Sequence, residues 1–190
     1  MQMFNELDPQ TGCLLISEPF MLDPNFERSV ILLCDHDSQD TTLGFILNHK
    51  VIGCVGDLIR EIATCTFPLH IGGPVSQNEL FFIHSRFDLL LSGEEINDNI
   101  YFGGDAELLF SLINENKINQ EDIKFFLGYS GWQSGQLDKE IKENSWAVQN
   151  KFSAALVFEK DTELLWKEAV ISLGAKYAHV ANFPQLPSLN

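Results

Sequence analysis

The 190-residue sequence has no apolar run long enough to cross a membrane. A transmembrane helix needs about 20 consecutive, mostly apolar residues, and the apolar stretches here are much shorter. The first residues also lack a basic segment followed by an apolar one, which is the pattern of a secretory signal. We therefore expect a cytoplasmic protein without membrane contacts.

Basic residues are scarce. The chain has 12 Lys and Arg against 27 Asp and Glu, for a net charge of −15, and its basic residues are scattered singly. Binding to nucleic acid without strong sequence selection depends on Lys and Arg that neutralise phosphates. The composition therefore disfavours direct nucleic-acid binding, unless a basic patch forms in three dimensions. A protein or small-molecule partner is the better expectation.

Cysteine is also sparse, and no C-x-x-C pair occurs. The four residues are Cys13, Cys34, Cys54 and Cys65. In a reducing compartment, free and mostly buried thiols are the expected state.

The apolar fraction of 45% and the 15 phenylalanines indicate a sizeable core rich in rings. Because no repeat, low-complexity tract or linker interrupts the sequence, we expect one compact domain over residues 1–190, with an irregular tail at 182–190.

Short apolar runs between turn residues predict strands at 11–17, 28–35, 43–48, 69–75, 80–84, 99–102, 123–127, 146–148 and 154–158. Apolar residues three or four apart predict helices at 55–63, 105–113, 137–141 and 162–173. Strands outnumber helices, and several are joined too briefly for crossovers. The expected fold class is α+β, with a mostly antiparallel or mixed sheet flanked by a few helices.

Residues 125–141 (FFLGYSGWQSGQLDKEI) are the stretch around which the chain is organised. They predict a buried strand, then a glycine-rich turn, then a helix for which Ser134 is the candidate N-cap. Tyr129, Trp132 and Trp146 form either an exposed binding surface or a core cluster, and a core cluster is the commoner use of such rings.

His36 follows the clearest buried strand, in the run CDHD (34–37). A zinc site would need two further ligands at suitable spacing, and the other histidines show none. We predict no metal and no cofactor. Ser130 lies in GYSGW (128–132), which only partly matches the G-x-S-x-G elbow of hydrolases, and Asp161 and His179 would have to complete a triad.

Two double-glycine turns, Gly72–Gly73 and Gly103–Gly104, could present amide groups to an anion, but Asp105 at the start of a helix would repel it. Tight turns are therefore favoured over a phosphate cradle. Arg28 could pair with a carboxylate such as Asp23, Asp138 or Glu140, which would be a structural ion pair rather than catalysis.

The segments 12–16 (GCLLI), 23–37 (DPNFERSVILLCDHD), 44–48 (GFILN), 72–75 (GGPV), 102–105 (FGGD) and 126–140 (FLGYSGWQSGQLDKE) together resemble the YqgE/AlgH family. His84, Trp146 and Trp166 also match its pattern. The resemblance covers nearly the whole chain. Mild departures occur at Ser130, Ser134 and Asp138, where the family usually has Ala, Pro and Glu.

The resemblance implies a compact domain with a coiled, partly bifurcated sheet. It supplies no assigned biochemical activity and no catalytic residues. One branch of the family is labelled as a candidate transcriptional regulator, but this sequence shows no helix-turn-helix pattern and has the wrong charge for direct DNA binding.

The leading hypothesis is a non-enzymatic binding or regulatory protein that affects transcription, if at all, through a partner. It predicts that Trp132→Ala keeps the fold and loses the partner. One alternative is an enzyme or small-molecule sensor with a site near residues 128–135, joined by His36 and Asp37. Another is direct DNA binding. The candidate binding residues are Arg28, His36, Gly72, Gly73, Gly103, Gly104, Tyr129, Ser130, Trp132 and Gln136.

Overall fold

The computed structural model describes residues 7–37, 39–159, 162 and 164–184. Its strands are β1 (Leu14–Ser17), β2 (Val30–His36), β3 (Thr42–Ile46), β4 (Lys50–Cys54), β5 (Pro68–Ile71), β6 (Val75–His84), β7 (Glu94–Asn97), β8 (Ile100–Phe102), β9 (Ile123–Trp132) and β10 (Trp146–Gln149). Its α-helices are α1 (Phe87–Leu90), α2 (Ala106–Asn114), α3 (Gln136–Lys142), α4 (Ala154–Val157) and α5 (Leu165–Ser172). Short 3₁₀ helices are η1 (Pro24–Phe26), η2 (Val55–Asp57), η3 (Arg60–Ile62), η4 (Ala175–Tyr177) and η5 (Val180–Asn182).

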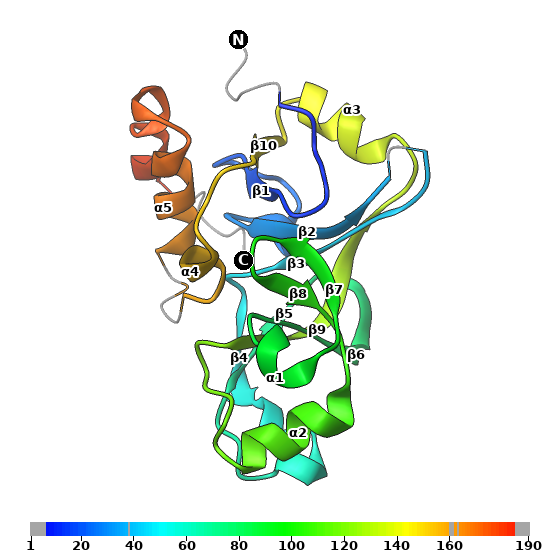
Figure 1. Cartoon of the computed structure of the whole chain (residues 1–190). Coiled ribbons are helices and arrows are strands. Elements are labelled where there is room, and N and C mark those ends of the chain that lie inside the picture. The colour runs from blue at the N-terminus through cyan, green and yellow to red at the C-terminus, as the bar shows by residue number, and fades with distance from the viewer. Residues whose placement is uncertain (1–6, 38, 160–161, 163, 185–190) are drawn as a thin grey trace.

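The ten strands form one sheet in the order β10-β1-β2-β3-β9-β6-β8-β7, and β4 and β5 leave this path. All strand pairs in the described residues are antiparallel except β5 with β9. The predicted α+β class with a mostly antiparallel sheet is confirmed. Figure 1 shows α5 beside the β10-β1-β2 end of the sheet and α2 at the opposite end.

Strand β9 is where the sheet divides. One of its edges pairs with β6 along most of its length. The other edge pairs first with β5, at residues 125–127, and then with β3, at residues 130–132. This is the bifurcation that the family resemblance implies. The expected break of the strand at Gly128 is wrong, because β9 continues to Trp132.

Gly128 stays inside β9 because a neighbouring segment passes close to it. Its φ is +66°, and a Cβ at this position would lie 2.5 Å from the Val75 carbonyl oxygen. Only glycine leaves room for that approach. Gly128 thus permits the close passage of β9 beside the segment that joins β5 to β6.

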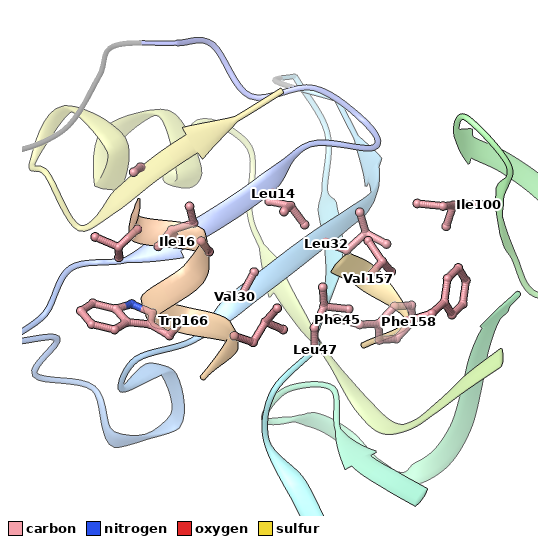
Figure 2. Packing of buried hydrophobic residues seen from close by; sticks show 14 of the residues in the cluster. Leu14, Ile16, Val30, Leu32, Phe45, Leu47, Ile100, Val157, Phe158 and Trp166 are labelled. Atoms are coloured by element: carbon pink, nitrogen blue, oxygen red, sulfur yellow. The ribbon is translucent and has the colours of Figure 1, made fainter. Parts of the chain in front are cut away.

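Three buried clusters make up the core. One lies between the sheet and helices α4 and α5, where Trp166 packs beside Ile16 and Val30 (Figure 2). A second contains Trp132, Trp146 and Leu137 of α3, and a third contains the apolar face of α2. Because neighbouring strand residues point to opposite faces, Phe45 joins the first cluster and Ile46 the second.

The helix predicted at 105–113 is confirmed as α2. The Asp105 carboxylate accepts the Leu108 amide at 3.0 Å, as an N-cap does. Leu109, Leu112 and Ile113 are buried, but Leu108, also predicted to point inward, is 36% exposed. The predicted helix at 162–173 forms over the shorter range of α5, and Gly174 follows it at φ +125°.

Three local predictions are wrong. Residues 55–63 form two 3₁₀ turns rather than one helix. They are held close to the chain at Cys65, whose carbonyl would lie 2.5 Å from a Cβ on Gly56. Residues 154–157 form helix α4, not a strand. Gly135, at φ +70°, occupies the N-cap position of α3 that was predicted for Ser134.

Strands β4 and β7 and helix α1 are absent from the predictions, because segments of four or five residues are too short to show a clear period. An irregular tail was predicted at 182–190. Asn182 is the last residue of η5, and residues 185–190 lie outside the described part. All four cysteines are free, and three are buried, as predicted. Within the described residues, no helix has both the length and the apolar character to cross a membrane.

Candidate ligand site at Arg28

Two pockets are relevant to the predicted site residues. The larger, of about 760 Å³, is lined by Leu7, Asp8, Pro9, His36, Asp37, Asp138, Ile141 and Lys142, and we call it the His36 pocket. The other, of about 550 Å³, is lined by Glu27, Arg28, Asn48, His49, Thr162, Leu164, Trp166, Lys167, Phe183 and Pro184, and we call it the Arg28 pocket.

The His36 pocket does not assemble the catalytic group that the enzyme alternative requires. His36 uses Nδ1 in a 2.7 Å hydrogen bond with the Thr42 hydroxyl, which ties β2 to β3. Asp37 joins it in the pocket lining, but none of the residues 128–135 does. Within the described residues, no cluster of His, Cys, Asp and Glu has the geometry to hold a metal ion.

Ser130 is not placed as a nucleophile. It is fully buried on β9, and its hydroxyl donates to the Gly72 carbonyl at 3.0 Å. It lies within a strand rather than on a strand-to-helix turn. Asp161, one of the partners considered for it, is outside the described residues.

The aromatic residues of the organising stretch do not share a surface. Trp132 is 4% exposed and packs edge-on against Trp146. Tyr129 belongs to a different buried cluster, where it packs against Phe81. The core interpretation of these rings therefore holds. Trp132→Ala should therefore destabilise the fold, contrary to the expectation from the sequence, because that change would open a cavity.

Gln136 supports helix α3 rather than a ligand. Its side-chain oxygen accepts the Gln133 amide at 3.0 Å, and its amide nitrogen donates to Glu140 at 2.8 Å. Both partners lie within the same turn and helix, so the side chain acts locally.

Three of the four candidate glycines permit close approaches of the chain, and the fourth, Gly103, has a left-handed backbone. A Cβ on Gly72 would lie 2.3 Å from the Gly128 carbonyl oxygen, and one on Gly73 would lie 2.2 Å from the Tyr129 carbonyl carbon. Gly103 has φ +67°, and Gly104 lies against Ser92. These are the tight turns that the sequence favoured over a phosphate cradle.

The Arg28 pocket begins with an unusual backbone. Arg28 has φ +46°, a left-handed conformation that side chains other than glycine and asparagine rarely adopt. Two neighbours hold it there. The Asn48 side chain donates to the Arg28 carbonyl at 2.8 Å and accepts the Val30 amide at 2.9 Å. His49 Nε2 lies 3.1 Å from the Glu27 carbonyl. The segment before β2 is thus fixed by residues that follow β3.

The Arg28 side chain is equally constrained. Its guanidinium lies 4.7 Å from the centre of the Trp166 ring, and Nη2 donates to the Phe183 carbonyl. Trp166 in turn donates its indole N–H to the Ser17 carbonyl at 3.0 Å. The Nε atom is buried and has no acceptor among the described residues.

Among the described residues, Arg28 forms no ion pair with any of the three carboxylates named for it. Asp23 caps the turn of η1 through the Asn25 amide. Asp138 lines the His36 pocket, and Glu140 accepts hydrogen bonds from two tryptophans.

The surroundings of Arg28 favour a positive potential. Lys167 also lines the pocket, and Glu27 is the one carboxylate among the lining residues that the structure describes. Helix α5 begins at this pocket, and a helix N-terminus carries partial positive charge. Burial lowers the pKa of His49, so its imidazole is neutral near pH 7 and can accept or donate one hydrogen bond.

Comparison with known proteins identifies the family. A model described as AlgH-like matches residues 14–178. The chain belongs to this AlgH-like family. A UPF0301 protein of Chlorobium limicola is 42% identical over 99% of this chain and 100% of its own. Another, from Parabacteroides distasonis, is 42% identical over 98% and 94% of the two chains.

Two solved structures have the same fold. The solution structure of AlgH from Pseudomonas aeruginosa has a TM-score of 0.70 at 23% identity, covering 96% of this chain and 100% of that one. A crystal structure of a protein from Corynebacterium diphtheriae has a TM-score of 0.77 at 22% identity, covering 95% of each. The YqgE/AlgH resemblance read from the sequence is confirmed.

Within this AlgH-like fold, sequence reasoning found Arg28 but missed the residues around it. Asn48 and Trp166 were predicted as parts of a strand and a helix and of the family pattern, but not as neighbours of Arg28, while His49 and Lys167 gave no signal. They lie 20 or more residues from Arg28 in the chain and meet it through the β2–β3 pairing and the docking of α5.

Proposed function

We propose that this AlgH-like protein is a non-enzymatic binding protein with a regulatory role, and that its ligand is a small molecule held in the Arg28 pocket. The observation that carries the proposal is the constraint on Arg28. A strained backbone, a guanidinium over an indole ring and a buried Nε–H with no acceptor in the described part of the chain meet at the wall of a pocket of about 550 Å³.

Strain of this kind costs stability and clusters at functional sites. A preorganised arginine at a pocket is what ligand recognition requires.

The alternatives receive less support. An enzyme or small-molecule sensor with its site at residues 128–135 would need accessible side chains there, whereas Ser130 and Trp132 are buried. Direct DNA binding is opposed by the net charge of −15. Any effect on transcription would then run through a bound partner.

A thermal-shift screen of the full chain against metabolites, nucleotides and metal ions tests the proposal. A ligand present at 100 times its dissociation constant adds about 2.7 kcal/mol to the unfolding free energy. For a domain of this size, that raises Tm by roughly 5–10 °C.

Matched variants assign a hit to one pocket. Lys167→Ala changes an exposed residue of the Arg28 pocket, and Asp138→Asn changes the His36 pocket. We expect the shift to shrink in Lys167→Ala and in Arg28→Ala, and to persist in Asp138→Asn. A hit that depends on Asp138 and ignores both basic residues would overturn the proposal.

A further inference from the structure

We infer that the ligand of the Arg28 pocket is an oxyanion, a carboxylate or a phosphate, and that it pairs with the guanidinium of Arg28 in place of the Phe183 carbonyl. The inference rests on the proposed function and adds the chemistry of the ligand and what its binding displaces. Three observations carry it: the charges of the pocket, the hydrogen bonds left unmade at Arg28, and the position of Phe183.

The charge of the pocket is opposite to that of the chain. With 27 acidic residues against 12 Lys and Arg in the whole sequence, a random set of neighbours would be acidic. Among the described lining residues, two cations, Arg28 and Lys167, instead face one carboxylate, Glu27. An anion entering this pocket meets two cations and the N-terminus of α5.

The guanidinium offers a donor edge that is only half used. Nε–H and the neighbouring Nη N–H of an arginine form a fork that matches the two oxygens of a carboxylate or a phosphate. At Arg28, Nη2 donates to the Phe183 carbonyl, and Nε has no acceptor among the described residues. A single carbonyl oxygen thus occupies a position where two acceptor oxygens fit.

An oxyanion is the better acceptor on this edge. Hydrogen bonds between charged partners are roughly twice as strong as those between neutral groups, and a bidentate partner also satisfies the buried Nε–H. The guanidinium carbon lies over the Trp166 ring, 4.7 Å from its centre, and this cation–π contact restrains the side chain. The fork is therefore oriented before the anion arrives.

Replacement of the Phe183 carbonyl by an anion on this edge of Arg28 affects the last described residues of the chain. The Phe183 ring stacks on Phe20, with ring centres 5.5 Å apart, and packs edge-on against His179. Loss of the bond from Arg28 removes the hydrogen bond that ties the Phe183 carbonyl to the pocket, and it leaves the ring contacts and the bond from the Phe183 amide to the Val180 carbonyl. Binding of the anion therefore loosens residues 183 and 184 from the pocket.

The experiment is an NMR titration of the full chain with inorganic phosphate and, separately, with succinate, against chloride at matched ionic strength. The signals followed are the Nε–H of Arg28 and the backbone amides of Phe183 and Lys167. We expect saturable shifts at all three. The tighter of the two anions identifies the phosphate or the carboxylate as the recognised group.

Variants separate the fork from simple charge. Arg28→Lys keeps the charge and loses the fork, so its affinity should fall by about tenfold or more. Lys167→Gln, at an exposed residue, should weaken binding several-fold without affecting folding. Arg60→Gln, an exposed arginine on η3, is the control and should bind as the wild type does.

The outcomes separate this inference from the proposed function. If neither anion gives saturable shifts while a neutral hit from the screen still binds at the Arg28 pocket, the oxyanion inference is wrong and the proposed function stands. If no ligand of any charge binds there, both are wrong. Anion binding that is as tight in Lys167→Gln and Arg28→Lys as in the wild type would also overturn the inference.

Discussion

The Glu140 carboxylate accepts the indole N–H of Trp132 at 2.9 Å, and the same oxygen, Oε2, accepts the indole N–H of Trp146 at 2.8 Å. The two rings are almost fully buried and come from different strands, β9 and β10. One side chain of helix α3 thus joins strands at distant places in the sheet. The stretch 128–140 is organised around this contact rather than around an exposed site.

Glu140→Ala should destabilise the protein by about 2–4 kcal/mol, because it leaves two buried indole donors without their acceptor. Glu140→Gln keeps one acceptor oxygen and should cost less. Urea unfolding followed by tryptophan fluorescence measures both changes. Glu143→Gln is the control, since Glu143 is exposed and only approaches Lys139 at 3.8 Å. It should change the free energy of unfolding by less than about 0.5 kcal/mol. A loss in Glu140→Ala that is as small as the loss in Glu143→Gln would refute this interpretation.

Gly72 and Gly135 should respond differently to alanine. A Cβ on Gly72 would collide with the Gly128 carbonyl oxygen at 2.3 Å, so Gly72→Ala should cost about 3 kcal/mol or more, or prevent folding. Gly135 has φ +70° and open space around it, so Gly135→Ala should cost only about 1 kcal/mol. Thermal unfolding of the two variants compares these effects. Equal losses would mean that Gly72 is not confined by β9.

Asn48→Ala should both destabilise the protein and impair the Arg28 pocket. It removes the hydrogen bonds to the Val30 amide and to the Arg28 carbonyl, for a loss of about 1–3 kcal/mol. Since those bonds hold Arg28 in its strained conformation, ligand affinity should also fall. Urea unfolding and a ligand titration of the same sample measure the two effects.

Asn78→Ala is the matched control for Asn48, because Asn78 is exposed on β6. Its stability should stay within about 0.5 kcal/mol of the wild type, with unchanged affinity. An Asn48→Ala protein that unfolds earlier but binds as tightly as the wild type would show that Arg28 does not depend on this clamp.

Lys124 should make stability depend on pH in the alkaline range. It is 4% exposed on β9, and its ammonium group donates to the carbonyls of Leu47 and Glu159, each at 3.3 Å. Burial lowers its pKa to about 7, the charge of Glu159 partly opposes this, and Lys50 adds to it. The neighbouring His70 is neutral in this range, because burial lowers its pKa to about 3.

Between about pH 7 and pH 10, the unfolded chain keeps a proton on Lys124 that the folded protein has lost, so the unfolding free energy rises with pH. The cost of burying the charge is fully present below pH 7. Across this range, the unfolding free energy of the wild type should rise by on the order of 2–4 kcal/mol relative to that of Lys124→Met. Urea unfolding at several pH values measures it. Lys151→Met, at an exposed lysine, should keep the wild-type slope, and an unchanged slope in Lys124→Met would contradict the account.

The sequence predicts the fold class because the signals of its main elements are local. The buried runs of β2 and β9 and the Asp105 cap of α2 need no knowledge of distant residues. The strand predicted at 154–158 is wrong because distant residues decide the structure there. Ala, Leu and Val suit a buried strand, but packing against the face of the sheet selects helix α4.

The candidate site is only partly predictable. Arg28 stands out beside a buried strand, but nothing in the sequence indicates its left-handed backbone or its neighbour Trp166. The contact joins residues 138 positions apart and exists only once α5 docks on the sheet. The prediction of Trp132 as a binding residue is wrong. An aromatic residue between glycines resembles a binding surface in the sequence, but Glu140 and Trp146 enclose it in the structure.

The central claim is that the Arg28 pocket, rather than the His36 pocket, takes a ligand. Chemical-shift mapping of the full chain with the strongest hit of the thermal-shift screen tests it most directly. The account predicts that shifts concentrate at Arg28, Asn48, Trp166 and Lys167 and disappear in Arg28→Ala. Shifts confined to His36, Asp37 and Asp138, and unchanged in that variant, would contradict it.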